Sequence, residues 1–272
     1  MSPADRAPGR PARFASRRGA LAGARALTPL LLALAIVVAS FVKGVIAFGF
    51  PIVATPLLAM VVDVKTAIAL SIVPNIVMDA LQVGRRSGDL RATARRVAVL
   101  LAFGFIGTVV GTGSLLVMPP RLALAILAVV VLGFVGLSVT GATFRVPRRS
   151  ERWLSPPVGF AAGFLGGVTN VPGTLLVLYF HALGLAKQDF VRSVALCFMT
   201  YKLIQLVTVA SYGLLTWPLL GESIALTVVG LGAFWLGLRV QDALPERIFN
   251  RAVLVFLTLL GVSLLARSLW PL

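Results

Sequence analysis

Long apolar runs separated by short polar segments make up most of the chain. A helix needs roughly 20 apolar residues to cross a bilayer, so each long run predicts a membrane-spanning helix. The eight long runs are residues 28–48, 66–84, 97–118, 122–142, 157–180, 193–212, 219–238 and 252–270. A shorter apolar stretch at 52–62 predicts a half-helix or a re-entrant segment. The pattern therefore predicts an all-α polytopic membrane protein with about eight transmembrane helices.

The composition excludes the other broad classes of protein. Hydrophobic residues make up 58% of the 272 residues and charged residues 12%, and the mean hydropathy is +0.98. A soluble domain is about 25% charged, so this chain has too few charges to cover a soluble surface of its size. Disordered and fibrous proteins are excluded by the same values, because both are poor in long apolar runs.

The net charge of +16 is concentrated in three short segments, residues 1–27, 85–96 and 145–152. Basic segments between apolar runs orient helices in a bilayer, with the basic side in the cytoplasm. Eight crossings put both termini on one side, so we expect both termini to be cytoplasmic. Lys187 and Arg192 would then face outward, so the second half supports this topology less well. The aromatic residues lie inside the apolar runs rather than among the arginines, so we expect no nucleic-acid partner.

An internal repeat of about 115–120 residues divides the chain. The segment 117–121 followed by an apolar run resembles the segment 242–247 followed by another. Four crossings in each repeat would give both repeats the same orientation. We therefore expect four regions: a disordered basic cytoplasmic tail (1–27), a first transmembrane repeat (28–142), a basic cytoplasmic linker (143–155) and a second transmembrane repeat (156–272).

The first helix of each repeat is interrupted by Gly and Pro. The interruptions lie at residues 48–51, which include Gly49, and at residues 169–173, which include Asn170 and Gly173. Pro removes a backbone donor and Gly tolerates unusual dihedral angles, so we expect both helices to break there. The positive N-terminal end of a half-helix suits an anion, and paired interruptions indicate a transporter site. The alternative is a packing kink in each helix.

A few polar side chains lie inside the apolar runs, where ionisable groups are costly and tend to be functional. Lys43 and Lys202 would attract a small anion, although either lysine could instead pair with Asp79, and Lys43 could snorkel to the interface. Asn75 shares a helix face with Asp79, and Gln205 fits a role as a hydrogen-bonding residue between helices. The predicted substrate-binding residues are Lys43, Gly49, Asn75, Asn170, Gly173, Tyr201 and Lys202, with Asp79 as a charge partner.

No enzyme motif, phosphate-binding loop or metal cluster is present in the sequence, which contains one cysteine (Cys197) and one histidine (His181). We therefore expect a protein that is not an enzyme and that uses no cofactor and no metal. The expected partners are a small anionic substrate and the lipid bilayer, and a homo-oligomer is left open.

Two stretches resemble the TauE/SafE family of sulfite-exporter-like membrane proteins. The clearer one runs over residues 159–176 and 184–192, and the other over residues 41–58. The resemblance covers about residues 30–270. It implies transport of sulfite, sulfonates or related small organic anions across the bacterial inner membrane. Phe48 and Phe50 stand at the first break, where many members are richer in glycine, so the family does not identify the anion.

These observations predict a secondary transporter for a small anion that works by alternating access, with one repeat moving against the other. Two alternatives remain at this stage. A passive anion channel would use the same polar residues. A membrane scaffold or assembly factor would neither bind nor transport anions.

Overall fold

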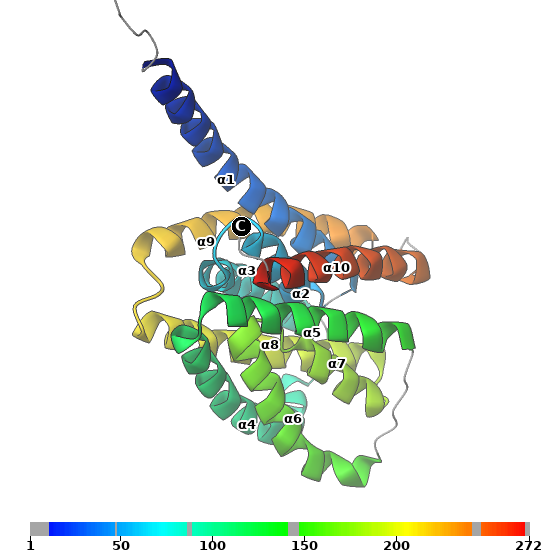
Figure 1. Cartoon of the computed structure of the whole chain (residues 1–272). Helices are drawn as coiled ribbons and strands as arrows, with labels where there is room; N and C mark the ends of the chain where they lie inside the picture. Colours follow the sequence, from blue (N-terminus) through cyan, green and yellow to red (C-terminus); the bar gives the residue numbers. More distant parts are fainter. Residues whose placement is uncertain (1–10, 47, 86–88, 141–146, 241–245, 270–272) are drawn as a thin grey trace, which may run out of the picture.

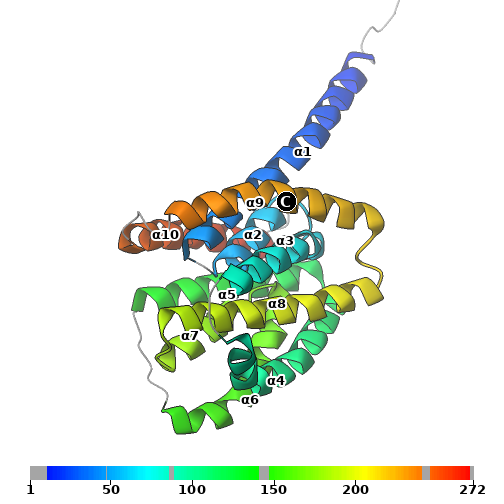
Figure 2. The same cartoon turned by 180° about the vertical axis from the view of Figure 1, so that it is seen from behind.

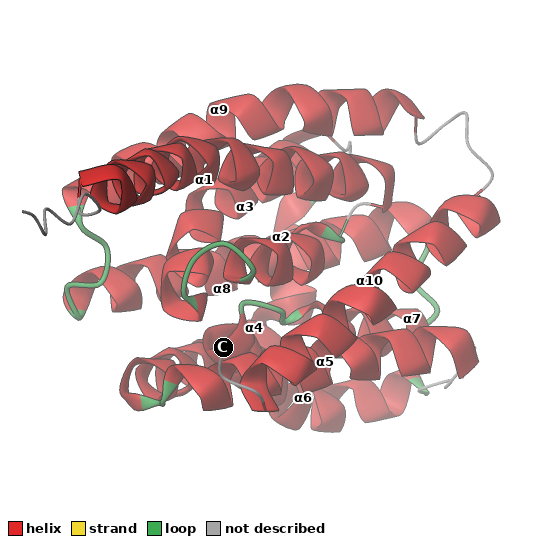
Figure 3. Ribbon diagram, turned by 45° about the horizontal axis from the view of Figure 1, so that its top comes forward, coloured by secondary structure: helices red, strands yellow, loops and turns green. Residues whose placement is uncertain are grey.

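The computed structural model describes residues 11–46, 48–85, 89–140, 147–240 and 246–269, and all regular structure in these ranges is helical (Figure 3). The helices are labelled in Figure 1. They are α1 (Pro11–Ile46), α2 (Phe50–Ala59), α3 (Val64–Arg85), α4 (Leu90–Val117), α5 (Pro120–Thr140), α6 (Arg148–Thr169), α7 (Gly173–Ala182), α8 (Lys187–Ser211), α9 (Trp217–Val240) and α10 (Glu246–Leu269).

Six of the described helices are long and apolar enough to cross a bilayer, namely α1 from Leu27 onward, α3, α4, α5 up to Leu137, α8 from Gln188 onward and α9. Their outward faces carry large apolar side chains, among them Phe105, Val228 and Leu236. In a membrane protein such faces contact lipid. The chain is therefore an all-helical polytopic membrane protein.

Each half of the chain contains a long helix, a ten-residue helix and three further long helices. The first break separates α1 from α2 and lies next to Gly49 and Pro51. The second break separates α6 from α7 and contains Asn170 and Pro172. The short helix predicted at 52–62 is α2, and the run 157–180, predicted as one crossing, is divided between α6 and α7.

The two halves are interleaved, because the first helix of each half packs against the fourth helix of the other. A Cβ atom placed on Gly163 of α6 would lie 2.2 Å from the carbonyl oxygen of Gly104 in α4. A Cβ atom on Gly44 of α1 would likewise lie 2.4 Å from the carbonyl oxygen of Phe234 in α9. Glycine is required for backbones this close. Between these helix pairs, α3 packs against α8 (Figure 2) and α5 against α10.

One end of the bundle, here called the basic end, contains the beginnings of α4, α6 and α8. Arg96 of α4 forms an ion pair with Glu151 of α6, and Asp89 and Gln188 line one pocket. Tyr179, near the end of α7, contacts Ser155 near the beginning of α6. Helix α7 therefore turns back to the end from which α6 starts, as a re-entrant hairpin does.

The opposite end contains the ends of α2, α4 and α10. The ammonium group of Lys65 donates to the carbonyl of Leu116 at 2.7 Å, and the guanidinium of Arg267 donates to the carbonyl of Ala59 at 3.1 Å. Helix α2 thus returns to the opposite end, while α7 returns to the basic end.

This arrangement corrects the expectation that the two halves share one orientation. The basic segment 85–96 was expected on the face opposite to Lys187 and Arg192, yet Arg96 and Arg192 line the same pocket. The physical reason is that each short helix turns back instead of completing a crossing. The α6–α7 hairpin therefore begins and ends at the basic end, whereas α2 ends at the opposite end.

Two boundaries differ from those expected. Helix α1 begins at Pro11, inside the region 1–27 that was expected to be disordered, and its first turns project from the bundle (Figure 1). Helix α6 begins at Arg148, inside the expected linker 143–155. Residues 1–10 and 141–146 lie outside the described residues.

Candidate functional site

Lys43 is fully buried near the end of α1, and its ammonium group faces α3. It donates to the carboxylate of Asp79 at 2.5 Å and to the carboxamide oxygen of Asn75 at 3.2 Å. Asn75 and Asp79 are one helical turn apart, so both reach the same ammonium group. The ring centroid of Phe198 in α8 lies 5.8 Å from the nitrogen of Lys43, within range of a cation–π contact.

Lys202 is buried in α8, and its hydrogen-bond partners are neutral. Its ammonium group donates to the carboxamide oxygen of Asn170 and, at 2.6 Å, to that of Gln205. The amide nitrogen of Gln205 donates in turn to the carbonyls of Gly166 and Gly167, in the last turn of α6. Gln205 therefore links α8 to the break in the second half.

Asn170 occupies the break itself, in the left-handed conformation with φ 67° and ψ 3°. It is the one non-glycine residue with positive φ in the described part of the chain. Asparagine is among the residues that tolerate this conformation, which often ends a helix. Its amide nitrogen donates to Thr55 at 2.8 Å and to Ser71 at 2.6 Å. One side chain thus connects the second break to α2 and α3.

These side chains form a buried polar group that we call the central network. Its members are Lys43, Thr55, Ser71, Asn75, Asp79, Asn170, Lys202 and Gln205. All eight are buried, and they come from α1, α2, α3, α8 and the end of α6. When ionised, the network holds two positive charges against one negative charge. Buried charge without a partner is costly, so the excess positive charge favours an anion.

Two buried atoms of the central network have no partner among the described residues. They are the second carboxylate oxygen of Asp79 and the amide nitrogen of Asn75. Buried polar atoms are nearly always satisfied, so unpartnered ones call for an explanation such as an exchangeable ligand or water. Asn75 offers a free donor beside Lys43, as an anion site requires.

A small apolar hollow lies beside the central network, where the two short helices begin. Its wall is formed by Phe48, Pro51, Ile52, Phe134, Val171, Gly173 and Phe198. No described side chain caps α2 or α7 through a hydrogen bond, so their first-turn N–H groups are not satisfied by a cap. The hollow has about 10 Å³ of space, close to the need of one water molecule. A larger ligand requires the surrounding helices to separate.

The structure brings together most of the residues singled out in the sequence. Lys43, Asn75 and Asp79 form one contact group, and Lys202 and Asn170 form the other. Gly173 lines the hollow, where its Cβ would lie 2.9 Å from the ring of Phe198.

Two of the residues singled out lie apart from the network. Tyr201 points away from it and donates to the carbonyl of Leu100 in α4 at 3.3 Å. Gly49 lies at the start of α2, against Val42 and Ile46.

Thr55 and Ser71 belong to the central network but were not predicted. Small hydroxyl residues are common in membrane helices as packing residues, so nothing in their sequence context separates these two. The signal that could have found them is their position within the runs that flank the first break. Gln205, expected only as a link between helices, does link α8 to α6 and also contacts Lys202.

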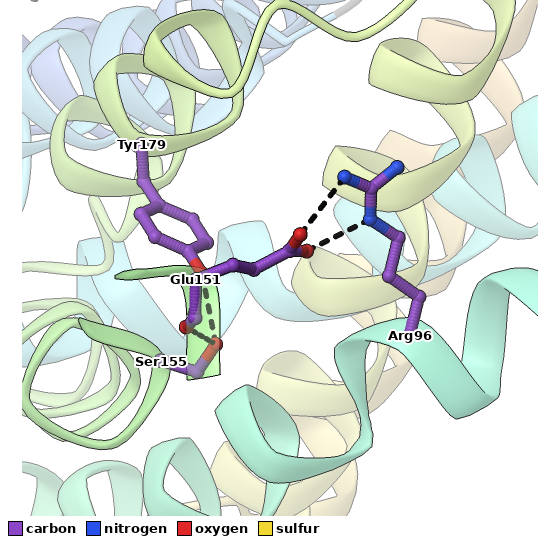
Figure 4. A network of polar contacts seen from close by, with 4 residues as sticks. All are labelled: Arg96, Glu151, Ser155 and Tyr179. Atoms are coloured by element: carbon purple, nitrogen blue, oxygen red, sulfur yellow. Dashed lines mark hydrogen bonds and ion pairs between the residues drawn. The ribbon is translucent and has the colours of Figure 1, made fainter. Parts of the chain in front are cut away.

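A second polar cluster, at the basic end, holds the α6–α7 hairpin against α4 (Figure 4). Arg96 binds Glu151 through two parallel hydrogen bonds of 2.8 and 3.1 Å. The hydroxyls of Ser155 and Tyr179 are 2.8 Å apart, and Tyr179 also donates to the carbonyl of Glu151. This cluster is partly exposed and near charge balance, so it fixes helices rather than attracting an anion.

Comparison with known proteins identifies the family. No curated protein and no solved structure matches the chain. A family model, described as sulfite exporter TauE/SafE, matches residues 32–264. The match begins within α1 and ends within α10, and it includes both breaks, the central network and the whole of α2 to α9. The chain therefore belongs to the TauE/SafE family of membrane sulfite exporters.

Proposed function

We propose that this chain is a secondary transporter that carries a small anion, such as sulfite or a sulfonate, across the bacterial inner membrane. One observation carries the proposal: a membrane protein of this family buries two lysines and one aspartate where its two broken helices meet. An excess positive charge in the bilayer core is expensive unless it binds a counter-ion. An anionic substrate would supply that counter-ion.

We infer that the two halves are inverted repeats and that transport occurs by alternating access. The re-entrant hairpins α1–α2 and α6–α7 enter from opposite ends and meet at the central network. Interrupted helices in corresponding positions of inverted halves are typical of transporter sites. Asn170 contacts Thr55 and Ser71 across the meeting point, so movement of one hairpin would change the contacts of the other.

The burial of the central network supports a carrier over a passive channel. A channel needs a continuous wet path, whereas the side chains of the central network are buried from solvent in the described state. A carrier passes through such closed states when it exchanges access between the two sides.

The distribution of basic residues supports placing the basic end in the cytoplasm. Arg91, Arg95, Arg96, Arg152 and Arg192 lie at this end, whereas the loops of the opposite end contain few basic residues. The basic end still contains more basic residues when the six arginines of residues 1–27 are counted with the opposite end. Both termini would then lie outside the cytoplasm, the reverse of the topology expected from eight crossings.

The function is tested with the purified full-length chain in proteoliposomes. Uptake of radiolabelled sulfite should saturate and show counterflow, and Lys202→Met should lower it roughly 100-fold, as expected for loss of a buried charge that binds substrate. Lys65→Met is the matched control, because Lys65 lies at the opposite end and binds a backbone carbonyl. Unsaturable passage would indicate a channel, and no passage of any anion would favour a scaffold.

Topology is tested separately by labelling single cysteines in intact cells, in a Cys197→Ala background. We expect Trp217→Cys, at the exposed start of α9, to react with an impermeant maleimide from outside. Arg152→Cys, at the exposed basic end, should react only after permeabilisation. The reverse pattern would place the basic end outside.

A further inference from the structure

We propose that the central network selects a monovalent anion that carries a small apolar group, and that it discriminates against divalent anions. This inference rests on the proposed function and specifies the substrate of the same site. The charge balance of the central network supports the preference for a monovalent anion. The apolar wall of the neighbouring hollow supports the preference for a small apolar group.

The charge balance of the network determines the preferred valence. Lys43 and Asp79 form a buried ion pair, which leaves Lys202 as the uncompensated charge because its partners are the neutral amides of Asn170 and Gln205. One bound monoanion makes the network neutral. A dianion would leave a net negative charge in an apolar interior, where uncompensated charge is strongly disfavoured.

Further donors are available for such an anion close to the two lysines. The amide nitrogen of Asn75 has no partner among the described residues and lies beside Lys43. Each ammonium group has three donors, and the described contacts use two on each lysine. A sulfonate or carboxylate head group could therefore be bound by several hydrogen bonds without displacing Asp79.

The hollow accounts for the apolar part of the ligand. Phe198 contributes to its wall and also faces the ammonium group of Lys43, so one aromatic ring is shared by the apolar space and the charged network. Phe48, Ile52 and Phe134 complete much of the remaining surface. Once the surrounding helices separate, a ligand with its head group at the lysines would place its other end against this aromatic wall, which stabilises a methyl or ethyl group but not a hydroxyl group.

Two matched pairs of ligands test the proposal by calorimetric titration of the full-length chain in detergent. Chlorate and sulfite are both pyramidal trioxoanions, and they differ in charge at a pH at which sulfite is the dianion. Ethanesulfonate and 2-hydroxyethanesulfonate have the same charge and differ by one hydroxyl group. We expect chlorate to bind about tenfold more tightly than sulfite, and ethanesulfonate about tenfold more tightly than its hydroxyl analogue.

Variants that change the net charge of the central network test the preference for monovalent anions without relying on ligand shape. Asp79→Asn raises the ionised network by one positive charge, so the ratio of chlorate to sulfite affinity should fall about tenfold. Lys43→Met combined with Asp79→Asn returns the network to the original net charge and should restore the ratio. Lys65→Met should leave the ratio unchanged. If Asp79→Asn does not fold, the wild-type ligand pairs and the charge-restored double variant still decide the question.

The outcomes separate failure of this inference from failure of the proposed function. Sulfite binding as tightly as chlorate, or equal binding of the two sulfonates, would overturn the inference while leaving an anion transporter. No binding of any of these anions, together with no effect of Lys202→Met on transport, would overturn the proposed function as well.

Discussion

The two buried lysines lie in the same network, but their neighbours differ in charge. Lys43 on α1 faces a carboxylate and an amide on α3, whereas Lys202 on α8 faces the amides of Asn170 and Gln205. In the first half the lysine lies on the interrupted helix, and in the second half it lies on the third helix. The positive charge of Lys43 is compensated by a carboxylate of the protein, whereas that of Lys202 is not. We therefore assign different roles to the two lysines.

The largest effect should come from breaking the compensated pair. Asp79→Leu removes the only anionic partner of Lys43 among the described residues and should lower the free energy of unfolding by about 3–5 kcal/mol. Lys43→Met combined with Asp79→Leu removes both charges and should recover most of that loss. Reversible unfolding in mixed micelles measures both variants. Equal losses in the single and the double variant would show that the pair does not act through its charges.

Lys202→Met should cost less stability, about 1–3 kcal/mol, because it leaves two buried amide oxygens without a donor but no uncompensated charge. The same unfolding measurement allows direct comparison with Asp79→Leu. If Lys202→Met were more destabilising than Asp79→Leu, the interactions of Lys202 would contribute more to stability than the ion pair of Lys43, which is the opposite of what we expect. Lys65→Met provides the baseline for loss of a peripheral lysine.

Asn170 contacts Lys202 and also contacts Thr55 and Ser71 in the first half of the chain. Two substitutions separate the effect of its backbone conformation from the effect of its side chain. Asn170→Gly and Asn170→Ala both remove the carboxamide, but only alanine is strained at a φ of 67°. We expect Asn170→Ala to be less stable than Asn170→Gly by about 1–2 kcal/mol. A thermal melt of both variants checks this, and identical melting temperatures would mean that the break relaxes to another conformation.

The smallest effect is expected at the basic end. Arg96 and Glu151 are a partly exposed ion pair, with side chains 31% and 21% accessible. Exposed pairs contribute about 0.2–1 kcal/mol, so Arg96→Gln should shift the free energy of unfolding by no more than that. A double-mutant cycle with Glu151→Gln isolates the pair. A coupling energy as large as that of Lys43 and Asp79 would mean that both pairs are equally shielded from water.

The sequence was sufficient for the helical class and the helix breaks, because both depend on local signals. Apolar runs predict helices, and Gly and Pro at 49, 51 and 172 mark the interruptions. Several members of the central network could also be chosen from the sequence, since a lysine or an aspartate in an apolar run has few explanations other than function or pairing.

The relative orientation of the halves could not be predicted in this way. A ten-residue helix after a break is compatible with either a completed crossing or a return to the same side, and the local sequence is the same in both cases. The decisive contacts, such as Tyr179 with Ser155 and Arg267 with Ala59, join distant segments. The position of Tyr201 outside the central network could not be predicted for a similar reason, because the face of α8 that it occupies depends on the space beside Gly104 in α4.

The exchange of helix partners between the halves has a consequence for synthesis of the chain. Gly44 and Gly237 lie against each other, although the seven helices α2 to α8 lie between α1 and α9 in the sequence. During translation, α1 enters the membrane long before α9 is made. The face of α1 that carries Gly44 should therefore contact lipid or an insertion factor until α9 arrives. The second half has no such delay, because α4 is already present when α6 is made. Packing of α1 against α9 should therefore be a late step of assembly, and truncation before α9 should leave α1 without its partner.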